Sequence, residues 1–596
     1  MALVLRTLLV LYVWRTHPFV RTPILDGEYY LRWAGGIASG DVAGTQGIVG
    51  GAAWVLNPLY AYLLAPFLGL FREPVLPILL AQGALGAATT ALAAASATRT
   101  FDARAGWIAG LLVAFSAPLA QLDTAIAVVE VAAFLVAGAC FACAPAAPGD
   151  RKGAHGPVAA ALWLGIGALA RPVTVLALPF VAWRFAREST RRVRTLVVAG
   201  AVFAACAVPG LVRNWAVSGE PIVYTASAGI NAHFGNNPDA RRDRAMMSTV
   251  VRFHPEDMYG DARRVVGLAL GHAPTAGEIS SWFWARTRDE IAQHPAESAA
   301  HYANKARWFL GPVEVPSTAS LTVDRWYSPW LRAAFVPTWL VAALAIAGLW
   351  AWRRRADVLL GPGAIVVAHW ATLTLVFPLS HYRAPAIPAM AILAGGALTA
   401  VGQAFRTSRR GAAAAIVGVA AAAAAVGAAP PGLAYLPSLD AFHLGLRDMQ
   451  ANRLVSAEDR ARESIALAAK EDGNARGEAL AWRLLGQVLV LQGRVADGGA
   501  ALDRSLALEP ADTDALRMRS AACEMVGDRV GAERDARAAT VVAPNDPEGW
   551  MRLGVVLAAD DARADDARAA LRRAIELGGS PDQASLVRLG MSKSPR

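Results

Sequence analysis

The sequence predicts an all-α protein, in which a polytopic bundle of membrane helices over about residues 1–430 is followed by an α-solenoid of helical repeats over 440–596. Two observations support this class. Apolar residues make up 55% of the 596-residue chain and charged residues 17%, with a mean hydropathy of +0.36, which excludes an ordinary soluble protein. From about residue 440, the chain instead repeats with a long internal period, in which small and large apolar residues alternate along paired helices.

The first part contains apolar stretches long enough to cross, or nearly cross, a hydrocarbon core of about 30 Å. These stretches lie at about 1–20, 56–71, 75–97, 107–122, 124–143, 157–183, 195–212, 331–352, 358–378, 385–404 and 411–428. The first one lacks a small-residue cleavage site and is followed by further stretches, so we interpret it as an anchor helix.

Clustered arginines predict the orientation of the bundle. The net charge of +10 does not indicate nucleic-acid binding, because the arginines punctuate the ends of apolar stretches. The positive-inside rule places the clusters at 184–194, 353–355 and 406–410 in the cytoplasm. The segment 213–330, which we expect to be a loop domain, the turn at 381–383 and everything after 429 are then external.

Two regions conflict with simple alternation of the spans. Arg99 and Arg104 look cytoplasmic, although two apolar stretches separate them from the external loop that begins near Asp26. Either 56–71 is a surface-lying or re-entrant helix, or these arginines break the rule. The stretch 157–183 has Lys152 before it and Arg184 after it, which a pair of short spans turning at Arg171-Pro172 would reconcile.

The four cysteines form no disulfide framework. Cys140 and Cys143 have the spacing of a redox or zinc pair, but they lie in an apolar stretch, as does Cys206. We interpret them as small apolar fillers.

The C-terminal part repeats with a period of 34 residues. Pro510 recurs as Pro544, and Trp482 recurs as Leu516 and Trp550. This period and alternation resemble the tetratricopeptide repeat, with three readable repeats and a candidate fourth at 441–470; the alternative is a generic helical bundle. Such arrays present a concave surface to peptides or proteins.

Short polar motifs stand at the membrane edges in a characteristic order. They are Asp26-Gly27-Glu28-Tyr29-Tyr30, Asn57-Pro58-Leu59-Tyr60, Ala170-Arg171-Pro172 and His381-Tyr382-Arg383-Ala384-Pro385. Together they resemble the polyprenyl-phosphate-dependent glycosyltransferases of the C-type (GT-C) fold, in the branch of the protein mannosyltransferases and the lipid A aminoarabinose transferase. The resemblance covers about 1–430. This chain has Asp26-Gly27-Glu28 where much of the family has adjacent acids.

The chemistry of that family assigns expected roles. An acceptor hydroxyl or amine must lose a proton, and the departing phosphate needs a positive partner. Asp26 is the expected general base, and Glu28 is its partner or a ligand to a divalent ion; the alternative is a solvated acidic turn. Arg383, supported by His381 and Tyr382, is expected to bind the donor phosphate; the alternative is an interfacial arginine with an aromatic anchor.

Other candidates extend this site. Arg171 lies in an apolar stretch, so it either faces the site, where it would also bind the donor phosphate, or pairs with Glu130 or Asp123. Asp123 is a further candidate catalytic acid, because the family uses a second acid near there. The candidates for substrate binding are Asn57, Tyr60, Asn236 and Asn237, and the last two also fit an ordinary Gly-Asn-Asn-Pro turn.

We therefore expect an inverting glycosyltransferase that moves a sugar from a polyprenyl-phosphate donor to a protein or glycan acceptor at the external face of the inner membrane. The repeats would bind a protein partner on that side. No cofactor is certain and a divalent cation is possible; nucleic acid is not an expected partner. The alternative is a transporter or flippase of lipid-linked glycans that uses Arg171, Glu130 and Asp123.

Overall fold

The computed structural model forms two compact units, Met1–Ala434 and Tyr435–Arg596. It describes residues 1–17, 20, 21, 23, 26–45, 54–146, 156–238, 240, 255–315, 320–407, 409–428, 436–471, 474–544, 546–577, 579 and 581–591. Within these ranges the regular structure is helical, apart from one bridge between Ser116 and Val336. The predicted all-α class is confirmed.

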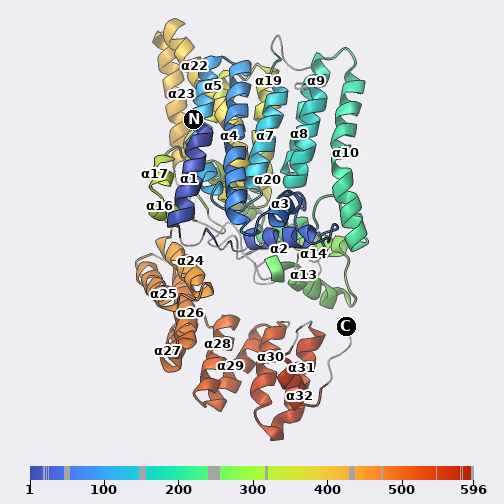
Figure 1. The fold of residues 1–596 in the computed structure, drawn as a ribbon, viewed down its shortest axis with the longest axis vertical. Coiled ribbons are helices and arrows are strands. Elements are labelled where there is room, and N and C mark those ends of the chain that lie inside the picture. The colour runs from blue at the N-terminus through green and yellow to red at the C-terminus, as the bar shows by residue number, and fades with distance from the viewer. Residues whose placement is uncertain are drawn as a thin grey trace. The chain divides into compact units, whose positions relative to one another are not determined.

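The bundle of the first unit is built from apolar helices (Figure 1). Its helices are α1 (Ala2–Thr16), α4 (Val75–Thr100), α5 (Ala103–Ala114), α6 (Ala117–Leu122), α7 (Val129–Cys143), α8 (Pro157–Ala170), α9 (Leu178–Glu188), α10 (Arg192–Ser218), α18 (Thr338–Ala351), α19 (Ala356–Val358), α20 (Ala364–Leu375), α21 (Ser380–Arg383), α22 (Ile387–Thr407) and α23 (Arg409–Gly427). Among the described residues, four helical stretches, which include α4, α10, α20 and α22, are long and apolar enough to cross a membrane. The protein is a multi-pass membrane protein.

Shorter helices complete this unit. They are α2 (Asp26–Ala38), α3 (Leu59–Leu70), α11 (Ala228–Phe234), α13 (Pro255–Leu270), α14 (Ala276–Gln293), α15 (Pro295–Leu310), α16 (Leu321–Tyr327) and α17 (Pro329–Ala333), with the single turns η2 (Pro172–Ala177), η3 (Leu359–Gly363) and η4 (Ala384–Ala386).

The two topological conflicts of the sequence have structural solutions. Helix α3 has 12 residues, which gives a length of roughly 18 Å, too short to cross, and it packs mainly on α2. This agrees with the surface-lying or re-entrant alternative for 56–71. Helix α8 ends at Ala170, Arg171 is extended, and the chain returns through η2 and α9 along α8. The predicted turn at Arg171-Pro172 is confirmed; Lys152 lies outside the described residues.

The two ends of the bundle differ in composition. The α9–α10 connection, α19 and the α22–α23 connection, which carry the arginine clusters, lie at one end in Figure 1, and α2, α3, α13 and α14 lie at the other. Exposed tryptophans occur toward both ends, as expected of a protein that meets two membrane interfaces. They include Trp107, Trp183 and Trp350, each within three residues of an arginine, and Trp215 near the end of α10 and Trp284 of α14 toward the other end.

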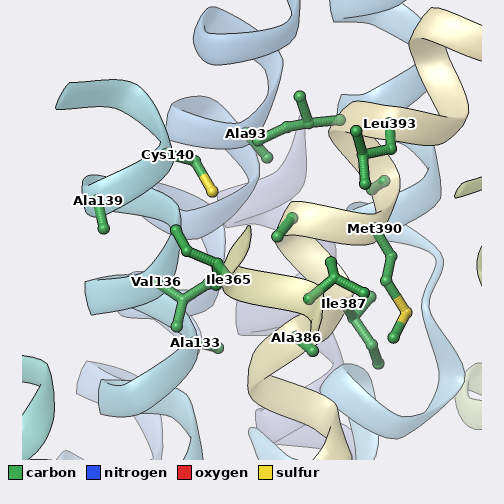
Figure 2. Packing of buried hydrophobic residues seen from close by; sticks show 14 of the residues in the cluster. Ala93, Ala133, Val136, Ala139, Cys140, Ile365, Ala386, Ile387, Met390 and Leu393 are labelled. Carbon is green, nitrogen blue, oxygen red and sulfur yellow. The ribbon is translucent and has the colours of Figure 1, made fainter. Parts of the chain in front are cut away.

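Close packing of small residues holds the bundle together. Figure 2 shows Cys140, Val136 and Ala139 of α7 among apolar side chains, including those of α22. A Cβ on Gly348 of α18 would lie 2.1 Å from the Leu393 carbonyl oxygen, so only glycine permits this contact of α18 with α22. Cys140 and Cys143 are free thiols buried in this core, as their interpretation as apolar fillers requires.

The second unit is a stack of helix pairs. The pairs are α24 (Pro437–Gln450) with α25 (Leu454–Ala468), α26 (Ala475–Leu491) with α27 (Val495–Leu508), α28 (Thr513–Met525) with α29 (Arg529–Val542), and α30 (Pro547–Leu557) with α31 (Ala564–Glu576), followed by α32 (Gln583–Arg588). The predicted repeats, with the candidate fourth at 441–470, are confirmed. Arg483 pairs with Asp514 at 3.2 Å, and Arg517, one period later, pairs with Glu548 at 3.2 Å.

Candidate functional site

The start of α2 brings a carboxylate against a buried tyrosine. Asp26 is the first residue of α2, and a Cβ on Gly27 would lie 3.1 Å from the Ile126 carbonyl oxygen, so the helix starts close against the 123–128 turn. Tyr30 follows one turn later and is buried. Burial, together with the nearby Asp26 carboxylate, raises the pKa of Tyr30 above its ordinary value, so the phenol stays protonated and can donate.

Arg171 joins this pair from another part of the chain. Its guanidinium carbon lies 4.1 Å from the centre of the Tyr382 ring. The charges of Asp26 and Arg171 both act on Tyr30 and on Tyr382. His381 stacks beside Tyr382 with ring centroids 4.1 Å apart and also interacts with Arg171. Residues near positions 26, 171 and 382 therefore converge on one site.

Asn57 and Tyr60 contact Tyr30 and the residue before Arg171, and so pack next to this site. The Asn57 side-chain amide donates to the Ala170 carbonyl oxygen at 3.3 Å. The backbone carbonyl oxygen of Asn57 accepts from the Tyr30 hydroxyl at 3.4 Å. Asn57 therefore ties α2 to the residue before Arg171. The Tyr60 hydroxyl donates to the side chain of Gln82, and its ring meets that of Tyr30 edge-on at 5.0 Å.

Two of the predicted site residues, Glu28 and Arg383, pair with side chains outside this site. Glu28 has a side chain that is 58% exposed, and it pairs with Arg32 at 2.8 Å. Arg383 is buried: its Nη1 donates to the carbonyl oxygens of Trp308, Phe309 and Gly311 at 3.0 to 3.1 Å, and its Nη2 lies 2.6 Å from the Glu314 carboxylate. Arg383 thus closes the C-terminal end of α15.

Asp123 and Glu130 lie inside the bundle. Asp123 is ion-paired with Arg6 of α1, and Arg6 also donates to the Val113 carbonyl oxygen at 3.2 Å. Both Glu130 carboxylate oxygens are buried and have no hydrogen-bond partner. Of the two alternatives for Arg171, a pair with these acids or a place in the site, its contact with the Tyr382 ring agrees with the second.

Asn236 and Asn237 are buried in the turn after α11. The Asn236 side chain donates to the carbonyl oxygens of Ala232 and Leu375 at 2.7 and 2.8 Å. The Asn237 side chain donates to the His233 carbonyl oxygen at 2.8 Å and accepts from the Ala240 amide at 3.0 Å. These bonds are those of a structural turn, the alternative that the sequence left open.

Sequence reasoning missed two residues of this region. Tyr30 belongs to the Asp26 motif, and its signal was its place one helical turn after the acid. His369 of α20 interacts with Arg171; its Nδ1 bonds the Ile365 carbonyl oxygen at 2.9 Å, and its buried Nε2 has no partner. A histidine inside an apolar stretch was the available signal. Among the described residues, no group of three or more His, Cys, Asp or Glu side chains is placed to hold a metal ion.

Part of the chain matches a known protein family. Residues 56–212 match the family model described as dolichyl-phosphate-mannose-protein mannosyltransferase. The predicted resemblance is confirmed. The matched mannosyltransferase-like segment contains Asn57, Tyr60, Asp123 and Arg171, while Asp26 and Tyr382 lie on either side of it. This segment is therefore similar to that family of glycosyltransferases.

Solved structures show low similarity to the chain. ArnT from Cupriavidus metallidurans, bound to undecaprenyl phosphate, is 16% identical with a TM-score of 0.37, over 92% of this chain and 79% of that one. MamA is 17% identical with a TM-score of 0.22, over 24% and 79%. YrrB, a tetratricopeptide-repeat protein with an unusual peptide-binding site, is 18% identical with a TM-score of 0.22, over 32% and 86%. No curated protein matches the chain.

Proposed function

We propose that the protein transfers a sugar from a polyprenyl-phosphate donor to an acceptor at the external face of the membrane, which is the face that carries α2. The convergence of Asp26, Tyr30, Arg171 and Tyr382 carries this proposal. A carboxylate and a guanidinium that both act on Tyr30 and Tyr382 therefore belong to one site of the apolar bundle. These are the groups that sugar transfer from a lipid phosphate requires.

Asp26 is the general base of the proposed reaction. The acceptor oxygen or nitrogen attacks the anomeric carbon and gives its proton to the Asp26 carboxylate. The bond from the anomeric carbon to the phosphate oxygen breaks, and its electron pair leaves with the polyprenyl phosphate. Attack opposite the leaving group inverts the anomeric configuration.

Arg171 is the phosphate ligand in this mechanism, in place of Arg383. The leaving phosphate gains negative charge, which a guanidinium stabilises through charge-assisted hydrogen bonds. Tyr382 holds the Arg171 guanidinium against its ring by a cation–π contact. Arg383 is already bound to three carbonyl oxygens and to Glu314, so it is assigned to holding the fold.

The direct test is transfer of radiolabelled sugar from synthetic polyprenyl-phosphate donors by the purified protein. We expect Asp26→Asn to lower kcat by about 10²–10⁴-fold, because the base is lost. Arg171→Met should raise the donor KM and lower kcat. Glu73→Gln, an exposed acid between α3 and α4, is the matched control and should retain full activity. Unchanged activity in Asp26→Asn and Arg171→Met would place the site elsewhere.

The transporter alternative gains no support from the intramembrane charges. It requires Asp123, Glu130 and Arg171 to line a common path. Asp123 is instead ion-paired with Arg6, and Arg171 stacks on Tyr382.

We further propose that the second unit recruits a protein partner on the external side. Its repeat period supports partner binding. The external side is supported by α23, which begins with the third arginine cluster and ends at Gly427, where a Cβ would lie 3.7 Å from the Trp339 ring near the start of α18. Affinity purification with and without residues 436–596 tests this proposal. Identical partner sets from both forms would refute it.

A further inference from the structure

A buried lysine lies outside the proposed chemistry. Lys305 of α15 is completely buried. Its ammonium donates to the Gly235 carbonyl oxygen at 3.0 Å, the Asn236 Oδ1 at 2.7 Å and the Val376 carbonyl oxygen at 3.1 Å. An ammonium has three donors, and all three are used. Lys305 therefore links α15 to the turn after α11 and to the chain that follows α20.

Further hydrogen bonds and a close backbone approach join α15, the turn after α11 and the end of α20. His301, one turn earlier on α15, donates to the Gly235 carbonyl oxygen at 3.0 Å. Asn236 donates to the Leu375 carbonyl oxygen at 2.8 Å. A Cβ on Gly235 would lie 1.7 Å from the Val376 carbonyl oxygen, so only glycine allows this approach. The external helices and the end of α20 are thus in direct backbone contact.

The segment 376–383 is held at its other end as well. The Ser380 amide donates to the Val315 carbonyl oxygen at 3.0 Å, and Arg383 binds the last turn of α15. Tyr382, which stacks on Arg171, lies between the two attachments. Its position therefore depends on where α15 holds this segment.

We propose that Lys305 is a positioning residue of the transferase site, which sets the place of Tyr382, and through it the Arg171 guanidinium, relative to the donor phosphate. This inference rests on the proposed function. The physical reason is geometric: a displacement of about 1 Å at a reacting centre can cost on the order of 10²-fold in rate. Burial lowers the pKa of Lys305 to about 7, and its three oxygen acceptors act in the opposite direction by stabilising the ammonium.

The test compares Lys305→Met with Lys470→Met in the full-length protein. Methionine removes the charge and keeps the length of the side chain, and Lys470 is exposed in the second unit. With activity normalised to folded protein, we expect Lys305→Met to raise the donor KM on the order of tenfold, and Lys470→Met to leave it unchanged. A donor KM that stays at the wild-type value, with kcat falling only as the folded fraction falls, would overturn the proposal.

If Lys305→Met does not fold, a second variant and a second measurement still test the proposal. Asn236→Ala keeps Lys305 and its two carbonyl partners but removes the bond to Leu375, so it should raise the donor KM by a smaller factor. Hydrogen–deuterium exchange should increase in 376–383 in both variants and stay unchanged in Lys470→Met. Unaltered exchange there would overturn the positioning role. A wild-type protein without turnover would refute the proposed function instead, and the exchange result would still decide the role of Lys305.

Discussion

Buried partners distinguish two arginines that look equivalent in the sequence. Arg171 and Arg383 both occur next to apolar residues, one and two positions before a proline. Arg383 is surrounded by carbonyl oxygens and the Glu314 carboxylate, and turning it toward a ligand would leave these acceptors unpaired. Arg171 instead lies over an aromatic ring, which holds its plane. The phosphate ligand we propose is therefore Arg171.

Arg6 should be important for stability. Its ion pair with Asp123 is almost completely buried, so Arg6→Met would leave a buried carboxylate without its partner. We expect a loss of about 3–5 kcal/mol in the free energy of unfolding, measured by chemical unfolding in detergent micelles. The double variant Arg6→Met, Asp123→Leu should recover most of that loss, because no unpaired charge remains. A loss below about 1 kcal/mol in the single variant would contradict this account.

At the scale of elements, several predicted spans are interrupted. The stretch 107–122 divides into α5 and α6 at Phe115 and Ser116, where Val336 makes a bridge. The stretch 358–378 starts with the turn η3, which contains Pro362, before α20 begins at Ala364. Hydropathy does not register such breaks, because the apolar side chains continue while the backbone pairs with a distant segment.

Glycines on α22 should be sensitive where another helix comes close. A Cβ on Gly395 would lie 2.6 Å from the Ala105 carbonyl oxygen of α5. Gly395→Ala should therefore lower the free energy of unfolding by about 1–3 kcal/mol. Gly402, on the same helix, has nothing within 4 Å, and Gly402→Ala should be neutral or stabilise by up to about 1 kcal/mol. Equal effects of the two substitutions on the melting temperature would refute this explanation.

In the second unit, small residues are likewise required where the two helices of a repeat pack closely. A Cβ on Gly486 would lie 2.7 Å from the Leu502 side chain, and one on Gly554 would lie 2.3 Å from that of Leu571. Ser520 occupies the equivalent place between them, and its hydroxyl donates to the Ala532 carbonyl oxygen at 2.7 Å. The departure of Ser520 from the repeat pattern is therefore compensated by a buried hydrogen bond.

At the scale of the whole molecule, the chain consists of a membrane unit and a helical repeat unit with separate cores. Neighbouring repeats contact each other along the chain, so the array carries its own stability. We expect residues 436–596, produced alone, to be soluble, to give a helical circular dichroism spectrum and to melt cooperatively. A fragment without a cooperative transition would show that the repeats require the membrane unit to fold.

The sequence by itself determined the class of the protein, the side shared by its arginine clusters, the turn at Arg171 and the 34-residue period. These follow from composition and from local periodicity, which neighbouring residues carry. Only the tertiary structure decided that Asp123 pairs with Arg6, 117 positions away, and that Lys305 joins three segments. The physical reason is that a buried charge is stable only when a partner lies near it in space. The local sequence pattern does not show which distant residues come that close.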